Sequence, residues 1–333
     1  MGSSLARVLL TAVVLMVHSQ SRAVDYFGHY AHSHQSGFYG SNEVNIVAVD
    51  AFDTTDIDAN AAAGIKSYVA NLFSDFFMPR TGYPCVFASQ PANGFDAWLT
   101  QTLGANRVKD VGAVYFDEPY YKLYGSAQCG TNTAQITQYI SDVAGYIKSE
   151  TAAKLPHAPP VTVAMDDVYY AVDGTYGVTR FPANVDWIGI EYYPCNGSLP
   201  SNWIQTFNGY LSSLLQKIDL QRQKIFLIPQ AFSGAGFICD NEVQLNALAD
   251  GFRGVLSTSN TPNILPYTVA VLPFLAGGDE NLVSGIEKYQ SVRANYTRFA
   301  QQYVIPIRTA AMRPIANALA ADVAGPTTGA VLP

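Results

Sequence analysis

The sequence predicts a single (β/α)8 barrel, and three observations support this prediction. Eight short apolar segments resemble buried strands, most of them precede a helical segment, and acidic or aromatic residues stand where several strands end. Strand–helix alternation favours a parallel sheet. About 310 residues fit a closed barrel better than an open sheet, because an open sheet needs a cofactor loop and no GxGxxG or GxxxxGK[ST] motif is present.

The expected strands are rich in Val, Ile and aromatic residues, as buried parallel strands are. They are Val24–Tyr30, Val44–Val49, Cys85–Ser89, Val111–Phe116, Val161–Met165, Val185–Tyr192, Ile225–Ile228 and Tyr267–Leu272. The expected helices repeat apolar residues at helical spacing. They are Ala59–Phe76, Phe95–Leu103, Thr133–Leu155, Asn202–Leu220, Glu242–Leu256 and Val292–Tyr303.

The two ends of the chain differ from the barrel between them. Residues 1–23 have the features of a secretory signal: Arg7, an apolar core over Val8–Val17 that is too short to span a bilayer, and the small residues Ser21 and Ala23. Residues 24–312 form the expected barrel, and residues 313–333, rich in Ala, Gly, Pro and Thr, form a tail. We therefore expect a secreted protein, extracellular or periplasmic.

Composition excludes several classes of partner. The chain has 333 residues, 49% of them hydrophobic, and a formal net charge of −7. An acidic protein is poorly suited to nucleic acid or to an anionic membrane, so neither is expected as a partner, and we expect a monomer. We also expect no cofactor and no metal. His32 and His34 are similar to the HxH pair of amidohydrolase barrels, but no histidines follow strands five and six to complete that site.

Four cysteines in a secreted chain predict two disulfides, and they allow three connectivities. Cys195 and Cys239 follow neighbouring strands, so a bond between them is geometrically reasonable. Cys85 and Cys129 flank neighbouring strands but would lie at opposite ends of the barrel, so either the strand-three boundary or this pairing must differ. The sequons at Asn196 and Asn295 are candidate glycosylation sites.

The most informative stretch is Val111–Tyr121, VGAVYFDEPYY. Because Pro119 cannot donate to a strand ladder, the strand must end at Asp117 and Glu118. Chemistry in α/β barrels occurs at this carboxyl end of the strands. The two acids are therefore candidate catalytic residues.

Other acids and aromatics follow the neighbouring strands. Acids can bind hydroxyls and transfer protons, and aromatic faces can stack on sugar rings, so together they suit a carbohydrate; some of the acids could instead cap the helices that follow. The candidate substrate-binding residues are Asp50, Asp166, Asp167, Tyr120, Tyr121, Tyr192, Tyr193, Gln230 and Phe232.

The eight-strand pattern with Asp117-Glu118-Pro119 after strand four resembles the (β/α)8 glycoside hydrolases of clan A. Strand four of that clan ends in Asn-Glu, often Asn-Glu-Pro, and the Glu is the general acid/base. The resemblance implies a glycoside hydrolase acting on a polysaccharide or glycan, with Glu118 as the proton donor. Two positions depart from the clan: Asp117 replaces the Asn, and Gln230 stands where strand seven of the clan carries the nucleophilic Glu.

Three arrangements could replace the missing acid. Glu191 at the end of strand six could be the partner carboxylate, which we favour. An Asp117-Glu118 pair is also similar to substrate-assisted N-acetylhexosaminidases, in which the sugar acetamido group attacks. Alternatively, Asp166 or Asp167 could activate water. A barrel that binds carbohydrate without catalysis remains as an alternative, since Gln230 would permit it.

Overall fold

The computed structural model describes residues 24–30, 43–89, 94–234, 236–239, 241–274, 283–285 and 288–304. The predicted signal segment 1–23, His32, His34 and the predicted tail 313–333 lie outside the described residues.

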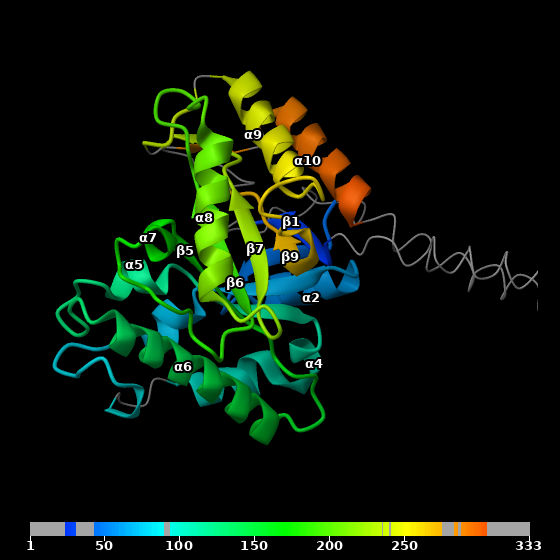
Figure 1. Cartoon of the computed structure of the whole chain (residues 1–333). Helices are drawn as coiled ribbons and strands as arrows, with labels where there is room; N and C mark the ends of the chain where they lie inside the picture. Colours follow the sequence, from blue (N-terminus) through cyan, green and yellow to red (C-terminus); the bar gives the residue numbers. More distant parts are fainter. Residues whose placement is uncertain are drawn as a thin grey trace, which may run out of the picture.

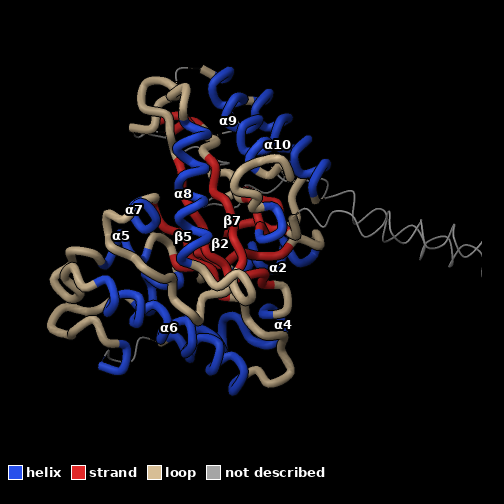
Figure 2. The backbone as a smooth tube through the Cα atoms, viewed as in Figure 1, coloured by secondary structure: helices blue, strands red, loops and turns tan. Residues whose placement is uncertain are grey.

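Eight parallel strands close into a barrel, which confirms the predicted fold (Figure 2). In barrel order they are β1 (Tyr26–His29), β2 (Ile46–Asp50), β3 (Lys66–Ala70), β4 (Val111–Phe116), β5 (Val163–Val168), β6 (Trp187–Tyr192), β7 (Lys224–Pro229) and β9 (Thr268–Val271). Two short segments, β8 (Ser233–Gly234) and β10 (Val283–Ser284), pair antiparallel outside it.

Helices surround the barrel, and α8, α9 and α10 can be followed along one side in Figure 1. The longer helices are α2 (Thr54–Ala62), α6 (Thr133–Lys154), α8 (Trp203–Lys217), α9 (Glu242–Val255) and α10 (Gln290–Tyr303). The shorter helices are η1 (Phe73–Phe77), η2 (Phe87–Ser89), α3 (Phe95–Ala97), η3 (Trp98–Leu103), α4 (Gly104–Val108), α5 (Pro119–Leu123), α7 (Tyr170–Asp173) and η4 (Leu265–Tyr267). No helix in the described part of the chain has both the length and the apolar character needed to cross a membrane.

The barrel interior is filled by every second residue of each strand, because side chains alternate between the two faces of a strand. Tyr68, Tyr115 and Phe226 are fully buried there and pack against one another. Gly189 on β6 makes room for the Phe226 ring, since a Cβ on this residue would lie 2.4 Å from the ring. The same alternation turns Glu191, two residues further on, toward the barrel axis.

Strand three is wrong in the sequence prediction. The expected helix Ala59–Phe76 is divided into the end of α2, strand β3 and turn η1, while the expected strand Cys85–Ser89 contains only the 3-10 turn η2. The error arose because both faces of β3 are buried, so no period of two shows. Ile65, Val69 and Leu72 then happened to fall at helical spacing.

Candidate active site

Strand β4 ends as predicted, and the change of direction occurs at Glu118. Helix α5 begins at Pro119, directly after the acid pair. Glu118 has φ 46° and ψ 51°, in the left-handed region that non-glycine residues rarely adopt. Such backbone conformations cost free energy and cluster at functional sites.

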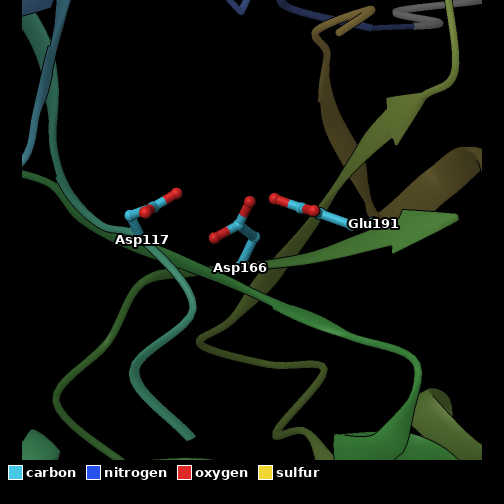
Figure 3. Close-up of side chains that lie close together, drawn as sticks. All are labelled: Asp117, Asp166 and Glu191. Atoms are coloured by element: carbon cyan, nitrogen blue, oxygen red, sulfur yellow. The ribbon is translucent and has the colours of Figure 1, made fainter. Parts of the chain in front are cut away.

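Three carboxyl groups from three adjacent strands meet inside the mouth of the barrel. One oxygen from each of Asp117, Asp166 and Glu191 lies within 4.8 Å of the other two. Asp166 lies between the other two acids (Figure 3). Asp166 and Glu191 occupy interior positions of β5 and β6, and Asp117 follows β4 in the same alternation. Among the described residues, this is the group close enough to hold a metal ion. We call Asp117, Asp166 and Glu191 the carboxylate cluster.

Asp117 is held by donors from three directions. Its Oδ1 accepts hydrogen bonds from the hydroxyls of Tyr30 at 2.6 Å and Tyr115 at 3.3 Å. Its Oδ2 pairs with the ammonium group of Lys122, one turn along α5. The Asp117 carboxylate is therefore fixed in orientation, and its charge is compensated.

Glu118 lies beside the cluster and is less exposed than an ordinary surface acid. Burial and, after it, the charges of Asp166 and Asp117 raise the pKa of Glu118 to about 7, against the opposing charge of Lys122. Its backbone N–H donates to Oδ1 of Asp166 at 3.2 Å, which links the end of β4 to β5. A carboxyl group with this pKa holds a proton near neutral pH and can donate it.

The inner two acids of the cluster are strongly perturbed. Asp166 is fully buried, and burial raises its pKa to about 6. Burial and the Asp166 charge raise the pKa of Glu191 well above its usual range. Like charges held this close disfavour full ionisation, so the pair retains a proton near neutral pH.

Asp167 does not join the cluster, although the sequence prediction included it in the substrate site. Its side chain points the other way from Asp166, since the two are adjacent in a strand. Oδ2 accepts from the backbone N–H of Tyr120 at 2.7 Å, at the start of α5. Asp167 thus caps α5, the helix that follows the neighbouring strand β4, and its role is structural, like that of an N-cap.

Gln230 is likewise structural in this fold. Its Oε1 accepts from the backbone N–H of Cys195 at 3.2 Å, and its Nε2 donates to the carbonyls of Phe232 at 3.0 Å and Phe237 at 2.8 Å. The side chain is fully buried and joins the loops after β6 and β7. These three hydrogen bonds occupy the side chain within the protein, which argues against the contact with substrate that the sequence predicted.

The predicted aromatic residues fall into two groups. Tyr120 and Tyr192 face the helices: the Tyr120 hydroxyl bonds the Thr137 hydroxyl at 2.7 Å, and the Tyr192 ring stacks on Phe207. They are not brought to the cluster. The other group lies toward the strand ends, where Tyr193 packs against Phe232, and Tyr121 is 54% exposed.

Asp50 lies at the end of β2, as predicted, but both of its carboxylate oxygens accept hydrogen bonds from nearby loop residues. Its Oδ1 accepts from the backbone N–H of Phe52 at 2.9 Å, and its Oδ2 accepts from the Asn71 amide at 3.3 Å. These bonds order the loops after β2 and β3.

Two disulfides join loops of neighbouring strands, Cys85–Cys129 and Cys195–Cys239. The conflict over Cys85 is resolved by the corrected strand three: Cys85 follows β3, so it lies at the same end of the barrel as Cys129. Among the predicted sequons, Asn196 is exposed, whereas Asn295 is 2% exposed and its amide nitrogen donates to Asn246 and Asp250. A glycan on that nitrogen would displace these bonds.

Sequence reasoning missed Tyr30, Tyr68 and Lys122, and it placed Tyr115 at the end of strand four without assigning it to the site. The contact of Tyr115 with Asp117 could have been foreseen, because Tyr115 stands two residues before Asp117 and therefore shares its face of the strand. Tyr68 required strand three to be placed correctly. Finding Lys122 required the helix α5 to be recognised, and a helix of only five residues shows no periodic pattern in the sequence.

Comparisons with known proteins support the fold. No protein-family model matches the chain, and no curated protein matches it. The structure is similar to GH26C from Muricauda sp. MAR_2010_75, with a TM-score of 0.53 and 11% identity over 85% of this chain and 87% of that one. A family 1 β-glucosidase from Thermotoga maritima gives a TM-score of 0.47 and 8% identity over 80% of this chain and 85% of that one.

A third structure is much longer than this chain. For β-glucuronidase 2 from Bacteroides uniformis the TM-score is 0.45 and the identity 9%, over 76% of this chain but 31% of that enzyme. The chain thus spans about a third of its length. At these identities the likeness extends to the barrel fold alone.

Proposed function

We propose that this protein is a secreted glycoside hydrolase in which Glu118 is the proton donor. The observation that carries the proposal is the position of Glu118 at the carboxyl end of β4, bonded through its backbone to Asp166 of the carboxylate cluster, where burial and the neighbouring acids raise its pKa to about 7. A protonated carboxyl group there can give its proton to the leaving oxygen of a glycosidic bond. Two disulfides support the secreted location, because such bonds persist in oxidising compartments.

Glu191 is the partner carboxylate in this proposal, supported by its place in the cluster with Asp166. Strands β4 and β6 are second neighbours, so their backbones are separated by about 10 Å. Side chains that reach toward each other shorten this distance, so either the retaining or the inverting separation of the two carboxyl groups is open to this pair. Asp117 supports Glu118 by fixing Lys122 at its side.

A substrate-assisted mechanism is the second candidate, favoured by one observation. Three donors orient the Asp117 carboxylate, and such an acid could hold the attacking acetamido group of an N-acetylhexosamine. This mechanism predicts that only N-acetylated substrates are cleaved.

The test is hydrolysis of plant, fungal, animal and bacterial polysaccharides by the wild type and by Glu118→Gln. Glu150→Gln, on α6 and paired with Lys154, is the matched control. We expect the control to keep its activity and Glu118→Gln to lose about 10²–10⁴-fold in rate. Equal activity in all three proteins would remove Glu118 from the chemistry. Binding without hydrolysis by the wild type would indicate a carbohydrate-binding barrel instead.

A further inference from the structure

We propose that the candidate site binds a sugar ring carrying a free, protonated amine, which the carboxylate cluster recognises. The inference rests on the proposed function, since it names the substrate class of the same site.

The first argument is charge. Glu118 adjoins the three acids of the cluster, and Lys122 is the basic side chain that pairs with this group in the described part of the chain. Its ammonium is directed to Asp117, and among the described residues no basic side chain forms an ion pair with Asp166 or Glu191. A ligand that brings one positive charge would offset the repulsion between these two acids.

The second argument is unmet hydrogen bonding. Oδ2 of Asp166 and the hydroxyls of Tyr68 and Tyr193 are buried, and within the described part of the chain none of them makes a hydrogen bond of good geometry, although Tyr193 lies within reach of Glu191 and Tyr68 within reach of Tyr115. Both hydroxyls lie close enough to the cluster to feel its charge: burial raises the pKa of each tyrosine most, and the charges of Asp166 and Glu191 raise it as well. Buried polar atoms in native proteins nearly always have partners, so these three atoms point to a ligand.

A protonated amine meets both needs. It carries a full charge and three N–H donors, whereas a sugar hydroxyl offers one donor and no charge. Hydrogen bonds between an ammonium group and a carboxylate are about twice as strong as neutral ones. An N-acetylated amine has a single donor and no charge, so the site should reject it relative to the free amine.

A divalent metal suits the cluster less well. Both oxygens of Asp117 already accept hydrogen bonds, one of them from the Lys122 ammonium. Ca²⁺ or Mg²⁺ needs six or more oxygen ligands, and its double charge would be repelled by that neighbouring ammonium. A single positive charge is therefore the better match.

Ligand binding should release protons. Asp166 and Glu191 hold a proton near neutral pH, and an ammonium group favours their ionised form. At an acidic pH, where the sugar amine is already protonated in solution, the only proton that moves is the carboxyl proton, and it passes to solvent. The measured heat of binding will then depend on the ionisation enthalpy of the buffer.

The experiment is isothermal titration of the wild type at pH 5.5, where the sugar amines are protonated, with tetrasaccharides of β-1,4-linked glucosamine and α-1,4-linked galactosamine. Each is titrated beside its fully N-acetylated form, in acetate and in MES, two buffers that differ in ionisation enthalpy and carry no primary amine. We expect at least one free-amine ligand to bind tenfold or more tightly than its acetylated form, with proton release. Asp166→Asn should lose this preference, while Asp142→Asn, at an acid on α6 bonded to Gln138, should keep it.

Equal affinity for both forms, or tighter binding of the acetylated one, would overturn the inference. So would tight binding of Ca²⁺ or Mg²⁺ alone that Asp166→Asn abolishes. The wild-type comparison needs no variant, so it stands even if Asp166→Asn does not fold. Hydrolysis of neutral glycans that depends on Glu118 but shows no preference for amines would defeat this inference and leave the proposed function intact. Preferential binding of amines without hydrolysis of any glycan would defeat the proposed function and leave this inference intact.

Discussion

The backbone N–H of Glu118 donates to the Asp166 carboxylate at 3.2 Å, and the Asp166 charge in turn raises the pKa of the Glu118 side chain. The same carboxylate thus holds the turn in place and adjusts the acid that the turn presents. Lys122 acts on Glu118 with the opposite sign.

These two neighbours predict opposite shifts in the pH dependence of activity. The alkaline limb of kcat/KM reports the acid that must be protonated. Asp166→Asn removes a like charge and should move this limb down by about one pH unit, while Lys122→Gln should move it up by a similar amount. Lys122→Arg keeps the charge and is the control. Limbs that do not move in either variant would show that Glu118 is not the titrating acid.

The buried acids predict that stability falls as pH rises. Because the pKa of Asp166 is about 6 in the folded protein and 3.8 in its ordinary state, the folded protein binds more protons between these values. The free energy of unfolding should therefore decrease across this window, by about 3 kcal/mol from this residue. Urea unfolding at pH 4, 5, 6 and 7 should show a flatter decline in Asp166→Asn. Parallel curves for the two proteins would contradict the assignment.

Gln230→Glu should destabilise the protein rather than create a strand-seven nucleophile. A carboxylate cannot donate to the carbonyls of Phe232 and Phe237, and it would be buried. We expect a loss of about 3–5 kcal/mol in denaturant unfolding, with no gain in activity. Gln221→Glu, at an exposed residue, should leave stability unchanged. A Gln230→Glu protein that is equally stable and more active would show that the position faces the substrate.

Expression in a eukaryotic secretory host should place a glycan on Asn196 and none on Asn295. Asn196 is exposed, whereas the Asn295 amide is hydrogen-bonded between α9 and α10. Intact-mass analysis of the wild type and of Asn196→Gln distinguishes the two sites. A glycan that persists in Asn196→Gln would mean that Asn295 is modified before the α9–α10 contact forms.

The fold could be predicted because most strands are followed by helices and end at polar residues. Strand β3 could not, since a strand buried on both faces has no alternation to reveal it. Within the site, alternation from Ala164 would have separated Asp166 from Asp167, and alternation from Gly189 places Glu191 inside. The hydrogen bonds by which Gln230 joins the loops after β6 and β7 could not be foreseen, because they depend on how these two loops meet in space.

The most direct test of Glu118 as proton donor uses substrates that differ only in their leaving group. For a sugar that the wild type cleaves, an alkyl glycoside needs a proton on departure and a 2,4-dinitrophenyl glycoside does not. We expect Glu118→Gln to lose about 10²–10⁴-fold in rate on the alkyl glycoside and to retain nearly full rate in the bond-breaking step of the dinitrophenyl glycoside. An equal loss on both substrates, or no loss on either, would contradict the role assigned to Glu118.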